Sequence, residues 1–425
     1  MKKSGHVATS VVLLLLCLMY GITYIDRVNI ATAAIAFRQE LGLSNIEYGW
    51  IASAFFYSYA MFQIIGGRIG DKYGPRLVLC VCGLIWAAST IGTGLAGGFW
   101  SFIFVRFMLG VGEGATFPTA TRAMSSWTRP GWRGFGQGIT HSFARMGNAL
   151  TPPLVVVLIA YWGWRGSFVA LGLVSLVWTV AWFFYFRNDP REHAGVSQAE
   201  LAVLPAYGSR KESPKVPWAR LVPRMLPTTF VYFCYAWSLW VFLTWLPQFF
   251  QQGYGLNLKN SALLTGAIGL GAVLGDTVGG VLSDWIYKKT GNLNAARRNV
   301  VILSFLGALL CLIPVFYVHD LVVLGACLCA AFFCLELIIG PIWSVPMDIA
   351  PRHSGTASGI MNTGSAVAGI ISPVVFGYIV DWSGSWQLPF AVSIGLLLLG
   401  AILSFWMRPD IPLDSPSVEA RRMAA

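Results

Sequence analysis

The feature that most constrains this chain is a series of long apolar runs that recur from its beginning to its end. A run of about 20 apolar residues is long enough to cross a hydrocarbon core of about 30 Å as a helix. Hydrophobic residues make up 56% of the 425-residue chain and charged residues only 11%, whereas a soluble globular protein carries roughly 25% charged residues. The sequence therefore predicts an all-α integral membrane protein.

Runs bounded by Gly, Pro and charge clusters mark about twelve predicted transmembrane helices. These spans cover residues 9–34, 46–66, 77–96, 100–121, 135–158, 164–186, 226–250, 260–283, 299–318, 321–346, 356–380 and 386–407. The segment between the sixth and seventh spans is rich in charged residues and Pro, which is typical of a solvated linker. We therefore expect four parts, a six-helix bundle at 1–187, a cytoplasmic linker at 188–225, a second six-helix bundle at 226–409 and a cytoplasmic tail at 410–425.

The distribution of Lys and Arg predicts how the chain is oriented in the membrane. Nearly all of these residues outside the spans lie in the N-terminal segment, the linker, the tail and the loops on one side, and only Arg38, Arg165 and Lys259 fall on the other. Because cytoplasmic loops carry an excess of Lys and Arg, both termini are expected in the cytoplasm. The same distribution explains the net charge of +11 without a nucleic-acid partner.

The eight Cys residues all lie within predicted spans. None has the spacing of a metal site, so we interpret them as small packing residues. The sequence also holds no phosphate-binding loop and no nucleophile with a matching base. We therefore expect neither a metal, nor a cofactor, nor an enzyme activity.

The two halves of the chain repeat one another. The matched features are Gly67 and Asp71 with Gly280 and Asp284, Glu113 and Pro118 with Glu336 and Pro341, Gly138 and Pro152 with Gly359 and Pro373, and Trp164 and Phe168 with Trp386 and Phe390. Because they occur in the same order at corresponding spans, they indicate a duplicated, pseudo-symmetric six-helix unit. Repeats of this kind with a binding site at their interface are a transporter architecture.

The cytoplasmic loop after the second span carries the pattern Gly67-Arg-Ile-Gly-Asp71-Lys-Tyr-Gly-Pro-Arg76. Its Gly residues permit close helix approach, and its Asp can cap a helix or pair with a base on a neighbouring span. We expect Gly67, Asp71 and Arg76, together with Asp284 in the second copy, to act as an inner gate. The alternative is an ordinary basic loop.

Ionisable residues inside the spans are the sharpest functional signal. Such groups cost at least about 2.5–3.5 kcal/mol to insert, so they usually face a cavity or a partner. The first half holds Asp26, Arg27, Arg106, Glu113 and Arg145, and the second half holds Asp276 and Glu336. Arg binds carboxylates through its planar fork, which favours an organic anion as the solute. The alternative is a closed, purely structural ion-pair network.

Spacing along the helices refines this interpretation. Asp26 and Arg27 are adjacent, so one is expected to face the cavity while the other contacts a neighbouring helix. Arg106 and Glu113 are two turns apart on one face, about 10 Å in rise. They can both line the cavity without forming a simple pair.

Several segments make the chain resemble the anion:cation symporter family of the major facilitator superfamily. They are Tyr24-Ile-Asp-Arg-Val-Asn29, Gln63-Ile-Ile-Gly-Gly67, Arg106-Phe-Met-Leu-Gly-Val-Gly-Glu-Gly114 and Leu243-Thr-Trp-Leu-Pro-Gln-Phe249, and the Gly67–Arg76 loop resembles the signature of the whole superfamily. The resemblance covers all but the linker and the tail, and it implies the major facilitator fold and a multi-pass position in a bacterial inner membrane.

The resemblance also implies roles for individual residues. Asp26 and Glu113 correspond to the two acids that family members use for proton coupling, and Arg27 and Arg106 to the basic pair near the bound carboxylate. Four further residues correspond to positions at or near the sugar-acid pocket, namely Tyr24, Tyr59, Trp343 and Asn362.

Arg145 departs from the family pattern, since related galactonate carriers resemble one another in having Gln at this point. A third buried cation would suit a substrate with a second carboxylate, or it would pair with an acid and never meet the substrate. We therefore include Arg145 among the candidate binding residues without choosing between a monoacid and a diacid.

These observations lead to one expected function and its alternatives. We expect proton-coupled uptake of a hexuronate, aldonate or aldarate by alternating access, by a monomer in the lipid bilayer with protons as the coupling ion. The same fold would also serve an organic-anion exporter or antiporter, because a fold does not decide direction. A receptor that binds its ligand without transporting it is the alternative from another class.

Overall fold

The computed structural model describes residues 7–43, 45–205 and 215–413. Parts of the predicted linker (206–214) and tail (414–425) lie outside this range. Within it the chain forms helices and turns and no strand, and each of the predicted spans falls on a helical segment. The all-α prediction is therefore confirmed.

The described residues divide into two compact units. Unit 1 comprises Met1–Pro130, Phe143–Lys215 and Arg352–Gly359, and unit 2 comprises Gly131–Ser142, Val216–Pro351 and Ile360–Ala425. Each unit therefore includes a short segment from the opposite half of the sequence.

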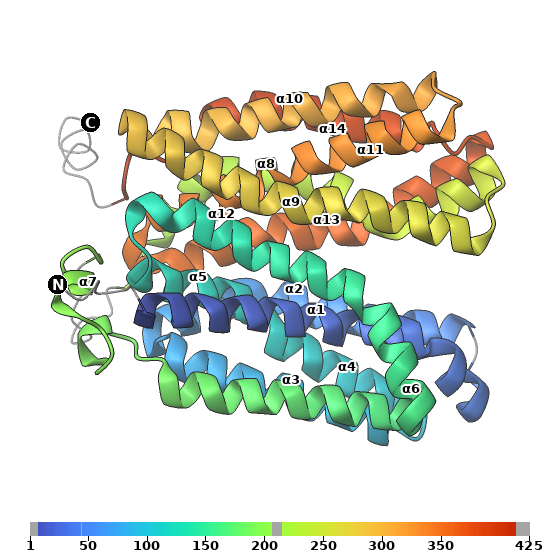
Figure 1. Cartoon of the computed structure of the whole chain (residues 1–425), viewed down its shortest axis with the longest axis horizontal. Helices are drawn as coiled ribbons and strands as arrows, with labels where there is room; N and C mark the ends of the chain where they lie inside the picture. Colours follow the sequence, from blue (N-terminus) through green and yellow to red (C-terminus); the bar gives the residue numbers. More distant parts are fainter. Residues whose placement is uncertain (1–6, 44, 206–214, 414–425) are drawn as a thin grey trace. The chain divides into compact units, whose positions relative to one another are not determined.

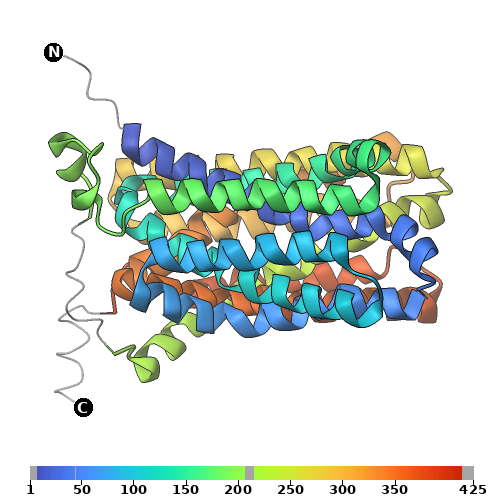
Figure 2. The same cartoon turned by 90° about the horizontal axis from the view of Figure 1, so that it is seen from below.

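Unit 1 is built from long helices that lie side by side, coloured blue to green in Figures 1 and 2. Its helices are α1 (Val7–Leu41), α2 (Asn45–Tyr73), α3 (Pro75–Leu95), α4 (Phe99–Gly114), α5 (Thr116–Trp127), most of α6 (Arg133–Tyr185) and the short α7 (Gln198–Leu201). Gly163 interrupts α6 with a φ of 67°, a left-handed conformation that favours Gly, and this break separates the fifth and sixth predicted spans.

Unit 2 is built from the helices coloured yellow to red, together with the start of α6. These helices are α8 (Trp218–Gln248), α9 (Leu258–Thr290), α10 (Val300–Leu312), α11 (Leu321–Glu336), α12 (Ile339–Ile349), α13 (Ser354–Ser383) and α14 (Pro389–Leu403). Short 3₁₀ or π segments complete the chain at Pro130–Trp132, Pro190–Glu192, Phe249–Gly253, Asn294–Asn299, Ile313–Phe316, Pro351–His353 and Ser404–Trp406.

Nine helical segments among the described residues are long and apolar enough to cross a membrane. One of them, Pro130–Tyr185, holds two predicted spans. The predicted spans at 46–66 and 100–121 lie on α2 and on α4 with α5, which are helical but fall outside this set.

The repeated Glu and Pro positions explain where two spans break. α4 ends at Gly114 and α5 begins at Thr116. Likewise α11 ends at Glu336 and α12 begins at Ile339. Pro118 and Pro341 follow each break, and a Pro cannot donate a hydrogen bond to the carbonyl four residues earlier. The breaks therefore occur directly after the buried acids Glu113 and Glu336.

Close helix packing holds α2 against α4. A Cβ added at Gly110 would lie 2.1 Å from the Ser58 Oγ, and one at Gly66 would lie 2.2 Å from the Ala115 Cβ. Only Gly permits this approach. The Gly-rich run of the fourth span therefore serves close helix packing.

The described part of the linker is more ordered than a solvated segment. Glu200 is buried and forms a capping box with Ser197, the N-cap of α7. Its carboxylate also accepts a hydrogen bond from the Thr9 hydroxyl at 3.2 Å. The His193 ring packs edge-on against Trp127 at 5.5 Å. The linker is therefore docked on unit 1, and its charge and Pro content did not reveal this.

Candidate functional site

The centre of the candidate site is a buried ion pair between Arg27 of α1 and Glu113 of α4. Glu113 is fully buried. Four aromatic rings surround the Arg27 guanidinium, with centroid distances of 5.0 Å for Tyr24, 5.3 Å for Phe55, 4.5 Å for Tyr59 and 5.0 Å for Phe117. Cation–π attraction strengthens where water is excluded, so the rings hold the guanidinium in place.

Arg106 lies beside this pair without joining it. Its guanidinium is 5.0 Å from the Phe55 ring centroid, so one ring contacts both Arg27 and Arg106. Among the described residues Arg106 makes no ion pair and no hydrogen bond, although it is only 4% exposed. The prediction that Arg106 and Glu113 need not form a simple pair is confirmed.

Asp26 points in another direction from Arg27. Its Oδ2 accepts a hydrogen bond from the Ser175 hydroxyl of α6 at 2.9 Å, and the carboxyl is buried. Adjacent residues on a helix face different neighbours, and here Arg27 meets Glu113 while Asp26 meets α6. Both residues therefore contact a neighbouring helix, and the expectation that one of them faces the cavity stays a prediction.

Arg145 contributes a third buried guanidinium to unit 1. Its NH1 donates to the Tyr24 hydroxyl at 3.4 Å, and the guanidinium is 5.9 Å from the Tyr24 ring centroid. Because Tyr24 also borders Arg27, the same side chain connects the two guanidiniums. The structure thus brings together the predicted residues Tyr24, Arg27, Tyr59 and Arg145.

The site retains hydrogen-bonding capacity that its own residues do not use. The Glu113 Oε1, the Arg27 NH2 and the Arg106 Nε are buried without a hydrogen-bond partner. Such groups are costly unless something satisfies them, and guanidinium N–H groups suit an acid group of a ligand. Within the described ranges no three His, Cys, Asp or Glu side chains cluster as metal ligands.

Trp343 and Asn362, the remaining predicted pocket residues, belong to unit 2. The Trp343 Nε1 donates to the Tyr232 hydroxyl at 2.9 Å, and its ring lies 5.0 Å from that of His141. Asn362 is buried in α13. Their contact with a substrate stays a prediction.

Asp71 caps the start of α13. It accepts hydrogen bonds from the backbone N–H of Gly355 at 3.0 Å and of Thr356 at 2.7 Å, and from the Thr356 hydroxyl at 2.6 Å. The Arg122 Nε lies 3.6 Å away, so Asp71 both caps a helix and faces a base, as expected. A Cβ at Gly67 would lie 2.2 Å from the Gly355 carbonyl oxygen, which explains the Gly.

Arg76 does not join Asp71. Its Nε donates to the Phe183 carbonyl at 2.9 Å, and its backbone N–H donates to the Asn188 side chain at 3.0 Å. It therefore anchors the start of α3 to the end of α6. Its predicted gating role has no contact with the Asp71 cap to support it.

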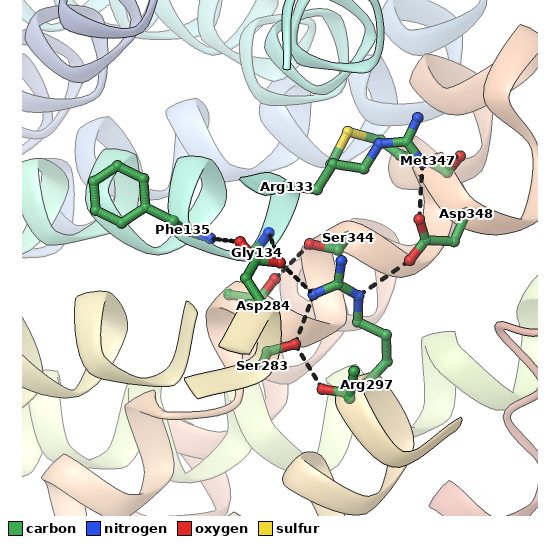
Figure 3. A network of polar contacts seen from close by, with 11 residues as sticks. Arg133, Gly134, Phe135, Ser283, Asp284, Arg297, Ser344, Met347 and Asp348 are labelled. Carbon is green, nitrogen blue, oxygen red and sulfur yellow. Dashed lines mark hydrogen bonds and ion pairs between the residues drawn. The ribbon is translucent and has the colours of Figure 1, made fainter. Parts of the chain in front are cut away.

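Asp284 repeats the Asp71 cap at the start of α6. It accepts hydrogen bonds from the backbone N–H of Gly134 at 3.1 Å and of Phe135 at 2.7 Å. Figure 3 shows the further network, in which Arg297 binds Asp284 at 3.0 Å and Asp348 at 3.1 Å. Arg133 binds the other oxygen of Asp348 at 2.8 Å.

Sequence reasoning missed several residues of these clusters. Arg133 and Arg297 were counted as loop cations on the cytoplasmic side, but the structure buries both because Asp284 and Asp348 neutralise them. Phe55 and Phe117 were not singled out. The spacing of Phe55 and Tyr59 by one turn on α2 was the available signal for the first.

Comparison with known proteins places these observations in a family. A model of the Major Facilitator Superfamily matches residues 16–373. The chain is 48% identical to the probable sulfoacetate transporter of Cupriavidus necator, covering 98% of this chain and 97% of the relative. It is 31% identical to the hexuronate transporter of Bacillus subtilis, covering 94% and 95%.

Solved structures agree on the fold. The proton:xylose symporter structure has a TM-score of 0.74 at 16% identity, covering 93% of this chain and 95% of that one. The fucose:proton symporter of E. coli has a TM-score of 0.73 at 13% identity, covering 94% and 99%. The chain is therefore a membrane transporter of the Major Facilitator Superfamily, in the group of anion:cation symporter-type carriers.

Proposed function

We propose that this transporter takes up a small organic anion with two acid groups, driven by protons. The observation that carries the proposal is the buried Arg27–Glu113 pair, with the further guanidiniums of Arg106 and Arg145 in the same unit. The relatives support an anion, since their names include sulfoacetate and hexuronate.

Competition for Arg27 provides the coupling. An acid group of the substrate that binds Arg27 displaces Glu113, which then loses its cation partner in a buried place. A buried carboxylate without a partner is costly, by several kcal/mol, so Glu113 takes up a proton. Substrate binding and proton binding therefore favour one another.

The number of guanidiniums favours a compact dianion. Arg27 and Arg106 share the Phe55 ring, and Arg145 reaches the same Tyr24 that borders Arg27. One acid group engages Arg27 and Arg106, and a second engages Arg145. Sulfoacetate, with a carboxylate and a sulfonate, and the aldarates, with two carboxylates, fit this arrangement better than hexuronates and aldonates, which carry one acid group.

The two Asp caps at the starts of α13 and α6 are the contacts that change during alternating access. Asp71 lies in the first half of the sequence and caps α13 of the second half, while Asp284 lies in the second half and caps α6 of the first. We propose that these contacts break and re-form in each transport cycle.

A ligand screen tests the substrate assignment. Thermal shifts of the native chain, of Arg145→Gln and of Arg298→Gln are measured with sulfoacetate, an aldarate, a hexuronate and an aldonate. Arg298 is half-buried and its Nε hydrogen-bonds its neighbour Asn299, outside the candidate site, so it serves as the matched control. We expect the native chain and the control to be stabilised most by the diacids, and Arg145→Gln to lose that preference.

Two results would contradict the proposal. Equal stabilisation of Arg145→Gln and the native chain by every ligand would assign Arg145 a structural role. Stabilisation by hexuronate or aldonate alone would make the substrate a monoacid.

A further inference from the structure

The polar groups around Asp26 form a second buried cluster in unit 1, separate from the Arg27–Glu113 pair. The Asp26 Oδ2 is held by the Ser175 hydroxyl of α6 at 2.9 Å. The Thr90 hydroxyl of α3 faces the same carboxyl. Asp26, Thr90 and Ser175 thus bring together polar groups of three helices. Asn29 follows three residues after Asp26 on the same side of α1 and is fully buried.

Most of this cluster's hydrogen-bonding capacity is unused by protein groups. The Asp26 Oδ1, the Thr90 Oγ1 and both amide atoms of Asn29 are buried without a hydrogen-bond partner. Native proteins keep few such groups, because each carries the full desolvation penalty. Polar sites of this kind bind internal water, which typically makes two to four hydrogen bonds to them.

The charged groups near Asp26 do not hold its carboxyl directly. α4 presents Glu113 and Arg106, which act on Asp26 electrostatically, while α3 and α6 present only the hydroxyls of Thr90 and Ser175. Arg27 on the same helix is turned to Glu113. Among the described residues Asp26 therefore has no ion-pair partner that would fix its protonation state.

We propose that Asp26, Thr90 and Asn29 bind internal water, and that this water delivers a proton to the Asp26 Oδ1, in addition to the proton that Glu113 takes up. The proton passes from a hydronium at the water site to Oδ1, leaving water and a neutral carboxyl, and release reverses the step. Because Ser175 occupies Oδ2, Oδ1 is the atom that exchanges. Ser175 and Thr90 are thus positioning residues for proton coupling, an assignment that rests on the proposed proton-driven function.

Two variants and two matched controls test the assignment. Ser175→Ala and Thr90→Val remove hydroxyls of the cluster. Ser167→Ala and Thr93→Val remove buried hydroxyls of the same helices, α6 and α3, that donate only to the Trp164 and Ser89 carbonyls. Sulfoacetate uptake into proteoliposomes is measured across a pH series, with counterflow at fixed pH as the proton-independent readout.

We expect the two cluster variants to move the pH midpoint of uptake to higher pH by about half to one unit. Ser175→Ala removes a hydrogen-bond donor to the charged carboxylate, and Thr90→Val removes a hydroxyl that holds the proposed water. Their counterflow should match that of the controls, whose pH midpoint should equal the native one. Profiles of Ser175→Ala and Thr90→Val that coincide with those of the controls would overturn the proposal.

An infrared titration of the purified protein gives an answer that does not depend on transport. The carboxyl band of Asp26, identified by its loss in Asp26→Asn, should titrate and should exchange rapidly in D₂O, since water reaches Oδ1. A band that exchanges slowly, or that Ser175→Ala does not shift, would overturn the water site. Failure of the native chain to take up any anion, with the infrared result as expected, would instead contradict the proposed function.

Discussion

Two buried charge clusters of this protein differ in how completely their carboxylates are bonded. In unit 2, both oxygens of Asp284 and both oxygens of Asp348 have a partner among Arg133, Arg297 and the α6 backbone. In unit 1, Glu113 and Asp26 each keep one buried oxygen without a partner. The two clusters have similar composition, since each contains acids and arginines.

This difference in bonding separates a carboxylate with a structural role from one that can exchange a proton. A buried network whose carboxylates have both oxygens bonded is costly to break, because removing one partner leaves an uncompensated charge. A carboxylate with one free oxygen can accept a proton there without first losing a protein contact. The two clusters therefore differ in their carboxylates, since guanidinium nitrogens without a partner occur in both, at Arg27 and Arg106 in unit 1 and at Arg133 and Arg297 in unit 2.

The largest expected effect comes from breaking the cluster of Arg297, Asp284 and Asp348 in unit 2. Arg297→Met leaves Asp284 and Asp348 without their shared cation, and we expect a loss of about 3–5 kcal/mol in the free energy of unfolding. Denaturant titration in mixed micelles measures it. The half-buried neighbour Arg298 has no ion pair among the described residues, and Arg298→Gln is the control, with an expected change within about 0.5 kcal/mol. Equal effects of the two variants would contradict the interpretation that this network stabilises the fold.

The next effect concerns the Arg27–Glu113 pair in unit 1. Arg27→Lys keeps the charge next to Glu113 but loses the planar fork. We expect the dissociation constant for the anion to rise about 10- to 100-fold, corresponding to about 1.4–3 kcal/mol lost from a charge-assisted contact, with the protein still folded. Isothermal calorimetry measures the binding. Unchanged affinity would mean that the anion binds elsewhere.

The two Asp caps allow a smaller and more direct test. Asp71→Ala removes the cap of α13, and we expect a loss of about 0.5–2 kcal/mol, the usual effect of an N-cap. Asp284→Ala should cost more, because it also releases the fully buried Arg297. Unfolding titrations of both variants give the comparison, and a larger loss for Asp71→Ala would contradict the difference between the two copies.

The smallest expected effect on stability comes from Glu40 and its hydrogen bonds with Trp164 and Arg165. Hydrogen bonds from Trp164 and Arg165 lower the pKa of Glu40, at the end of α1 beyond the first span, below its ordinary 4.5. Its contribution to stability is therefore complete above about pH 4.5 and is lost as the pH falls through the lowered pKa. We expect the thermal midpoints of the native chain and Glu40→Gln to differ at pH 6 and to converge on acidification. A difference that is constant with pH would exclude this contribution.

The sequence predicted the spans and the buried charges because both depend on local composition. The different directions of Asp26 and Arg27 were also predictable, since adjacent helical residues face different neighbours. The burial of Arg297 was not, because its neutralising partners Asp284 and Asp348 are distant in sequence. Of the aromatic residues around Arg27, the sequence analysis identified Tyr24 and Tyr59 but not Phe55 and Phe117. Phe55 resembles any other aromatic residue of a membrane helix.

The assignment of Gly131–Ser142 to unit 2 was likewise beyond sequence reasoning. It depends on close backbone contacts, such as that between Gly138 and the Asp276 carbonyl oxygen, which would lie 2.2 Å from an added Cβ. The repeat marked Gly138 as special but gave no partner for it. Hydropathy, which located the helix, carries no information on which neighbour it packs against.

The central claim is that an organic anion and a proton move together. Its most direct test is sulfoacetate uptake into proteoliposomes under an imposed inward proton gradient, with and without a protonophore. We predict accumulation that collapses with the gradient for the native chain, and counterflow without gradient-driven accumulation for Glu113→Gln. Uptake that is unaffected by collapsing the gradient would contradict proton coupling.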